Sequence, residues 1–221
     1  MEVKQHNIKR AIVSQIPDIE LFDERIIHNK VHYNKFHVVR VIPKGSKGFL
    51  VFKKDRTGYY CYFIELLSKK SINKQGGLFI NYKNYKKRLA VHRIYKFNSC
   101  FDEMLACGCG TILYGTLCWN DNISIKSNLK YFITENIFYF KGRRNRFNGW
   151  NNIFENIVSC IKKNTGKGYY NKNSVVVCSP ITKTLPVNIN DLIESVGYDI
   201  YCIQYINLNN SNYYTKFINK T

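Results

Sequence analysis

The chain has 221 residues, of which 45% are hydrophobic, so it can bury one sizeable core and is a poor candidate for a disordered protein. It carries 34 Lys and Arg against 15 Asp and Glu, a formal net charge of +19. Such a charge attracts polyanions such as RNA, DNA or an acidic membrane surface. An AT-rich genome that inflates Lys, Asn, Ile and Tyr would give the same excess. The basic residues are spread along the chain, so we expect any electropositive face to belong to the fold.

The apolar segments and the cysteines indicate an intracellular protein. The sequence has no apolar run of 18 residues, and its first residues, MEVKQHNIKR, lack the basic-then-apolar order of a signal peptide. We therefore expect a soluble, non-secreted protein whose eight cysteines are reduced. Cys107 and Cys109 form the one close pair, but a single intervening residue is not the spacing of a zinc knuckle. Packing or surface roles are favoured for them over metal binding.

Hydrophobic periodicity predicts an N-terminal helical segment, residues 1–35, ahead of a series of strands. Four apolar residues keep helical spacing before Pro17, namely Ile8, Ile12, Val13 and Ile16. A second short helix is indicated around residues 19–22. The expected strands are 36–42, 49–54, 59–66, 76–82, 88–97, 110–122 with a turn at Gly115, 131–142, 174–182 and 198–208.

The connections between these strands are expected to be of three kinds. Residues 43–48 (PKGSKG) are predicted as a flexible basic loop, 55–58 as a tight turn, and 99–108 as a loop or helical turn. Residues 149–165 predict an amphipathic helix, and residues 188–196 a short helix capped by Asn188 or Asn190. We therefore expect an α+β protein made mainly of antiparallel sheets with a few packed helices.

Two neighbouring segments carry a pattern that is shared with a known family. Tyr114-Gly115-Thr116 lies within the strand 110–122, and the next strand begins with Tyr131 to Glu135 and ends at Gly142. This order resembles the nucleotidyltransferase domain of mRNA guanylyltransferases and ATP-dependent polynucleotide ligases, over residues 36–206. The resemblance implies a nucleotidyltransferase-like core in which Gly115, Glu135 and Gly142 line a mononucleotide cleft. Only residues 207–221, an asparagine-rich tail, follow this region, so no OB-fold lid is expected, although Lys216 could mimic the family's final lysine.

The catalytic groups of that family are incomplete in this sequence. The resemblance places Lys44 where the family has the lysine that attacks the α-phosphate, but Ser46 stands where its aspartate should be. A near match, Lys53-Lys54-Asp55-Arg56, lies one strand later. Thr116 replaces the glutamate of the second motif, which leaves Glu135 and Asp199 as acids in family positions. We therefore expect no resident metal ion, with Mg²⁺ or Mn²⁺ required only if the protein is catalytically active.

The remaining side chains still suit nucleotide binding. Glycines and lysines of residues 43–48 would hold phosphates, and aromatic rings would stack on a base, with Tyr131 and Tyr139 as further stacking candidates. The expected nucleotide-binding residues are Lys44, Gly45, Lys47, Gly48, Tyr114, Gly115, Thr116, Trp119 and Lys141. Arg143, Arg144 and Arg146 would continue along an RNA backbone. Each of these assignments has a purely structural alternative. Residues 43–48 could be a surface turn, Lys141, Arg143 and Arg144 could belong to a solvated basic loop, and the aromatic rings could pack in the core.

These observations favour a binding module for a nucleotide, mRNA cap or RNA 5′ end, a degenerate form similar to the cap-binding domain of snurportin. One alternative is an active guanylyltransferase or ligase subunit that forms a lysyl-nucleotide adduct through Lys44. Another is a structural virion protein that reuses the fold. A composition typical of an AT-rich genome, in a small separate capping-like domain, is typical of large DNA viruses. This association implies viral transcription or capping proteins as partners, a cytoplasmic viral factory or the virion as location, and no membrane association.

Overall fold

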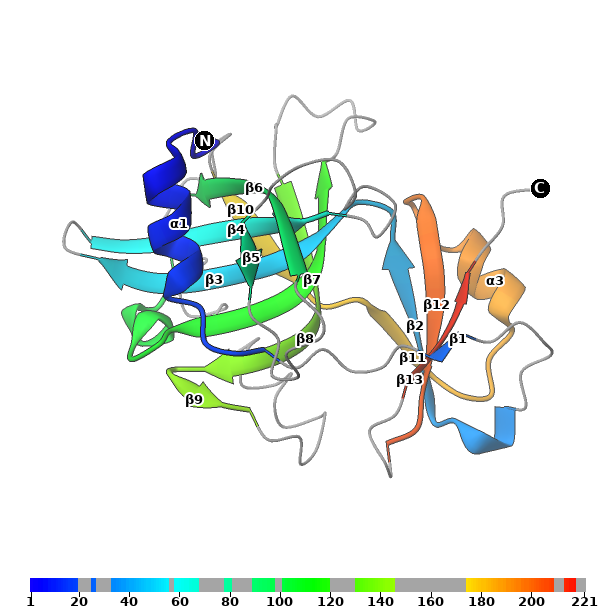
Figure 1. Ribbon diagram of the computed structural model, residues 1–221. Helices are drawn as coiled ribbons and strands as arrows, with labels where there is room; N and C mark the ends of the chain where they lie inside the picture. Colours follow the sequence, from blue (N-terminus) through cyan, green and yellow to red (C-terminus); the bar gives the residue numbers. More distant parts are fainter. Residues whose placement is uncertain are drawn as a thin grey trace.

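The computed structural model describes residues 1–19, 25–26, 33–55, 58–67, 78–80, 89–97, 101–119, 130–145, 174–208 and 213–217. Within these ranges the chain forms two mainly antiparallel sheets and two short α-helices (Figure 1). The expectation of mainly antiparallel sheets is therefore confirmed, with helix as a minor part of the described fold. No helix in these ranges is long and apolar enough to cross a membrane.

The first sheet has eight strands and curls into a half-barrel. Its strands are β3 (Ser46–Asp55), β4 (Gly58–Leu66), β5 (Phe79–Ile80), β6 (Leu89–Phe97), β7 (Thr111–Trp119), β8 (Lys130–Phe140), β9 (Arg143–Arg144) and β10 (Val175–Cys178). Their order is β10-β8-β7-β3-β4-β6-β5, with β9 folded back on β8. All pairs are antiparallel except β10 with β8.

Alternating side chains give this sheet two apolar faces, as expected for strands that are covered on both sides. On one face, which we call the α1 face, Phe49 and Ile64 pack with Val13 of helix α1 (His6–Ser14). On the other, the η3 face, Phe52 and Phe63 pack with Leu105 of the 3-10 turn η3 (Glu103–Ala106). The expected helical turn within residues 99–108 is thus confirmed, and so is the expected N-terminal helix.

The second sheet has five strands in the order β1-β13-β12-β2-β11. They are β1 (Arg25–Ile26), β2 (Val38–Pro43), β11 (Ile181–Thr184), β12 (Ile200–Ile206) and β13 (Tyr213–Phe217). Helix α3 (Ile189–Glu194) covers one face by packing Leu192 against Val39, Val41 and Ile203. The side chain of Asn188 caps α3 by accepting a hydrogen bond from Asn190 N, so the first of the two expected caps is the one used.

The connectivity makes the first sheet an insertion in the second. All strands of the first sheet lie between residues 46 and 178, whereas the strands of the second sheet come before and after this stretch. The chain passes from β2 to β3 through Lys44 and Gly45, and from β10 to β11 through residues 179–180 (Figure 1). Because β2 and β11 are paired, both crossings lie at the same end of the second sheet.

Three local expectations need correction. Residues 43–48 are not a loop, since only Lys44 and Gly45 lie outside β2 and β3. The strand expected at 174–182 is two strands in different sheets, because Pro180 has no N–H to continue a ladder. Gly115 makes no turn, because β7 runs through it with an unbroken pairing to β3.

The remaining expectations concern the ends of the chain and two further helices. The structure has a 3-10 turn, η1 (Tyr33–Lys35), after β1, and places β13 within residues 207–221. The helix expected at 149–165 lies outside the described residues, as does most of the one expected at 19–22.

Candidate functional site

The α1 face of the first sheet becomes polar where β3, β7 and β8 approach the second sheet. Along β3 the apolar residue Phe49 is followed, two residues closer to the crossing, by Lys47. Lys47 pairs in register with Thr116 of β7, which in turn pairs with Ile133 of β8. The residues that α1 covers are thus replaced by a basic and a hydroxyl side chain at the junction of the two sheets.

A β-bulge adds a carboxylate to this junction. Gly115 pairs with Thr134 and Tyr114 pairs with Asn136, so Glu135 is the extra residue of β8 between two regular pairs. A bulge of this kind redirects a side chain out of the regular alternation, and such bulges are common beside functional sites. Here it accompanies a carboxyl side chain that is only 6% exposed.

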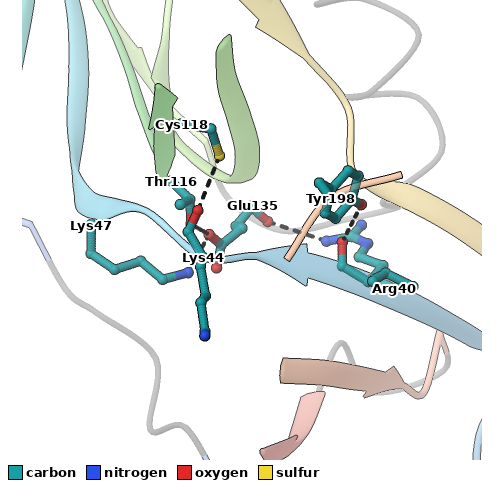
Figure 2. Close-up of polar contacts among 8 residues, drawn as sticks. Arg40, Lys44, Lys47, Thr116, Cys118, Glu135 and Tyr198 are labelled. Carbon is teal, nitrogen blue, oxygen red and sulfur yellow. Dashed lines mark hydrogen bonds and ion pairs between the residues drawn. The ribbon is translucent and has the colours of Figure 1, made fainter. Parts of the chain in front are cut away.

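Glu135 is held by contacts from both sheets (Figure 2). Thr116 Oγ1 donates a hydrogen bond of 2.6 Å to Glu135 Oε1, and Lys47 Nζ forms an ion pair with the same oxygen. From the second sheet, Arg40 Nη1 donates to the main-chain oxygen of Glu135 at 3.2 Å. Figure 2 shows Glu135 between Lys47 on one side and Arg40 on the other. The junction is therefore bridged by charged groups.

Arg40 is a buried cation on β2, with 5% of its surface exposed. Burial lowers the pKa of Arg40 to about 9, and the nearby Glu135 partly opposes that shift, so the guanidinium is charged at neutral pH. Its register neighbours across the second sheet are polar as well: Thr182 on β11 and Gln204 on β12, with Thr215 beyond on β13. The second sheet thus presents a polar row beside Arg40.

Lys44 lies at the crossing itself. Its backbone N–H donates to Asp199 O at 2.7 Å, and its carbonyl oxygen accepts from Cys118 Sγ at 3.5 Å, which fixes the crossing against both sheets. Its amine is 3.9 Å from Asp199 Oδ2, and the side chains are 49% and 63% exposed. An ion pair as exposed as this is weak, so the amine remains accessible to a ligand.

Gly45 permits the close approach of this crossing to β7. A Cβ atom at Gly45 would overlap Leu117 O and lie 2.7 Å from Thr116 Cγ2. One thiol and one phenol lie nearby. Burial raises the pKa of Cys118 to about 11 and that of Tyr198, which donates a hydrogen bond to Val41 O, to about 12. These groups are therefore neutral at physiological pH.

Tyr201 is a residue of the junction that the sequence did not identify. It belongs to β12, and its side chain is 42% exposed although Ile200 and Cys202 beside it are buried. Lys47 Nζ lies 5.6 Å from the centre of the Tyr201 ring, within the range of a cation–π contact. Arg40 was also missed, because a single arginine in an apolar strand gives no signal of which sheet it will face.

The structure brings together five of the expected site residues, namely Lys44, Gly45, Lys47, Thr116 and Glu135. Gly48 and Gly115 lie elsewhere, because a Cβ atom on either would point to the η3 face, against Phe63 and Phe132. Tyr114 packs in the core, with its ring 5.5 Å from that of Phe49. The side chain of Trp119 lies outside the described residues, and so does Arg146.

The remaining expected residues occupy the far end of β8. Lys141 and Gly142, at φ 50° and 80°, form the tight turn between β8 and β9, and Gly142 N donates to Gly110 O at 2.9 Å. Arg143 and Arg144 are exposed on β9. The expectation that Gly115, Glu135 and Gly142 line one cleft is therefore wrong, because they lie on different faces and at different positions of the first sheet.

The residues at the junction do not fit a divalent metal ion. Across the described ranges, no three His, Cys, Asp or Glu side chains are grouped as ligands would be. Glu135 Oε1 already accepts from Thr116 and pairs with Lys47. A hard cation needs several free oxygen ligands, and the described residues of the junction do not supply them.

No protein-family model matches the chain, and no curated protein is significantly similar to it in sequence. The candidate site is therefore defined by its own residues: the basic side chains Arg40, Lys44 and Lys47, the carboxylates Glu135 and Asp199, the hydroxyl of Thr116 and the ring of Tyr201.

Proposed function

We propose that the junction of the two sheets binds the phosphates of a nucleotide, an mRNA cap or an RNA 5′ end. The observation that carries this proposal is the convergence of Lys44 and Lys47 on a junction that also contains the buried cation Arg40. Lys44 is half-exposed and Lys47 is 27% exposed, so both amines are within reach of a ligand from solvent. Charged donors of this kind make the strongest hydrogen bonds to phosphate oxygens.

The proposal includes a degenerate guanylyltransferase-like core in residues 36–206. Three features support it: β7 and β8 are neighbours in one sheet, Lys44 stands at the crossing between two antiparallel sheets, and β12 returns beside β2. Glu135 Oε1 is engaged by Lys47 and Thr116, which is unlike a carboxylate that organises a metal ion. In this proposal, Arg143 and Arg144 on β9 contact the backbone of a bound RNA.

The test is equilibrium binding of GTP, of a cap analogue and of a 5′-triphosphorylated RNA to the wild type and to Lys47→Met. We expect the substitution to weaken binding by about tenfold or more, because it removes a charged phosphate contact. Lys183→Met is the matched control, since Lys183 is an exposed lysine on β11. Equal affinities for the wild type and both variants, or no binding by the wild type, would contradict the proposal.

A second candidate, nucleotidyl transfer through Lys44, is favoured by the accessible amine at the crossing. In that reaction Lys44 Nζ would bond to the α-phosphorus of GTP or ATP, pyrophosphate would leave, and the amine would release a proton to solvent. Incubation with α-labelled nucleotide and Mg²⁺ or Mn²⁺, followed by a denaturing gel, distinguishes the two candidates. A labelled band that Lys44→Ala abolishes would establish the enzyme, and no band in the wild type would leave the binding module.

A further inference from the structure

We infer that Tyr201 is the surface on which a nucleobase stacks at the junction. The inference rests on the proposed function and deepens it, because it assigns the base to the second sheet and the phosphates to the crossing. It adds a contact for the base to a proposed function that assigns contacts to the phosphates alone.

A bulge in β12 presents Tyr201 to the junction. Ile200 pairs with Pro43 and Cys202 pairs with Ile42, so Tyr201 is the extra residue between two regular pairs. Its neighbours Ile200 and Cys202 are 9% and 1% exposed, whereas Tyr201 is 42% exposed. A large ring left accessible between two buried residues offers a face to a ligand. The bulge is the counterpart of the one that carries Glu135 in the first sheet.

Lys47 connects this ring to the phosphate-binding groups. The Lys47 ammonium lies 5.6 Å from the centre of the Tyr201 ring and is also paired with Glu135. A ligand whose base contacts Tyr201 would therefore have its phosphates beside Lys47. The amine of Lys44, two residues before β3 begins, faces Asp199, which is two residues before Tyr201. The aromatic and basic groups are thus spaced along one short part of the junction.

Four other tyrosines of the described ranges are less suited to this role. Tyr114 packs against Phe49 and Phe138. Tyr205 is only 1% exposed, and its ring packs against that of Phe36. Tyr139 lies towards the β9 end of β8, where its phenol interacts with Arg144. Tyr59 is as accessible as Tyr201, at 37%, but it lies at the start of β4 beside Lys54.

The test compares GTP with inorganic tripolyphosphate, which has the phosphates but no base, on the wild type, Tyr201→Ala and Tyr201→Phe. We expect the wild type to bind GTP about 5- to 150-fold more tightly than tripolyphosphate, the factor expected from aromatic stacking on one base. Tyr201→Ala should remove most of this difference, and Tyr201→Phe should keep it. Tyr59→Ala is the matched control, because it also removes an exposed tyrosine beside a lysine, and it should change neither affinity.

The outcomes separate the inference from the proposed function. If the wild type binds neither compound, the proposed function fails. If Tyr201→Ala keeps the preference for GTP, the inference fails while phosphate binding stands. If Tyr201→Ala weakens both compounds equally, Tyr201 acts by holding Lys47 rather than by stacking, which also overturns the inference.

Discussion

At the scale of single residues, Glu135 is the group on which the junction depends. It is a nearly buried carboxylate whose neighbours are a partly exposed lysine, a threonine hydroxyl and a buried arginine. Removing one partner of such a pair leaves the other charge uncompensated, which costs more than the pair contributes when it is intact. Glu135 therefore both stabilises the junction and competes with any phosphate for Lys47.

We expect Glu135→Gln to change stability and affinity in opposite directions. The free energy of unfolding should fall by about 2 kcal/mol, less than for a fully buried pair because Lys47 is partly solvated. Affinity for tripolyphosphate should rise, because Lys47 is no longer neutralised. Urea unfolding and calorimetric titration measure the two effects.

The control is Glu65→Gln. Glu65 also accepts a hydrogen bond, at 2.8 Å from Ser46 Oγ, but it lies on β4, where it pairs in register with Gly48 and Arg93. We expect this variant to lose less than about 1 kcal/mol and to bind tripolyphosphate as the wild type does. A fall in affinity for Glu135→Gln would show that the carboxylate orients Lys47 rather than competing for it.

At the scale of elements, β7 and β8 lie so close together that their contact excludes a side chain at Gly115. A Cβ atom there would overlap Ile133 O and lie 3.0 Å from the Phe132 ring. The overlapped atom is backbone of the neighbouring strand, so it cannot move without disturbing the sheet. This close contact lies beside the bulge, since Gly115 pairs with Thr134, the residue before Glu135.

Gly115→Ala should therefore lower the free energy of unfolding by about 2–3 kcal/mol, because the extra methyl group must push β7 and β8 apart. Gly197→Ala is the matched control, since nothing lies within 4 Å of a Cβ atom built there. We expect it to change stability by less than about 0.5 kcal/mol. Thermal or urea unfolding of the two variants is sufficient, and equal stabilities would show that the sheet accommodates the methyl group.

The elements also show how far the sequence could be read. Short apolar runs were enough to predict β3, β4, β7, β8 and β12, because strands that are buried on both faces appear in the sequence as nearly continuous apolar segments. The passage from one sheet to another at Lys44 was not predictable, since an extended chain has the same pattern whichever sheet it joins. The bulges at Glu135 and Tyr201 were also missed, because each depends on pairing with a strand distant in sequence.

The same limit applies to the site. Lys44 and Glu135 were expected from the resemblance and Lys47 from the glycines and lysines of residues 43–48, and all three lie at one junction. Arg40 reaches Glu135 across 95 residues of sequence, a contact that only the arrangement of the two sheets determines.

At the scale of the whole molecule, the net charge of +19 predicts binding to nucleic acid that weakens with salt. Each phosphate contact on a single strand contributes about −0.7 to the slope of log affinity against log salt. Arg143 and Arg144, exposed on β9, are the two adjacent arginines of the described surface that we propose for this role.

Replacing both Arg143 and Arg144 by Ala should reduce the magnitude of that slope by about 1.4 for a single-stranded RNA. Binding measured at several salt concentrations gives the slope directly. Arg10→Ala combined with Lys183→Ala removes the same number of exposed charges, from α1 and β11, and should leave the slope nearly unchanged. An equal decrease for both double variants would indicate that RNA is attracted by the overall charge, with no preferred path.

The insertion of the first sheet into the second has a consequence for the order of folding. β2 and β11 are direct partners, but residues 44–180 separate them, and closing so long a loop in an unstructured chain is entropically unfavourable. Once the first sheet has formed, the two crossings are held near each other and the loop is in effect short. The second sheet should therefore assemble last, so the junction that we propose as the phosphate site would exist only in the fully folded protein and not in partly folded intermediates.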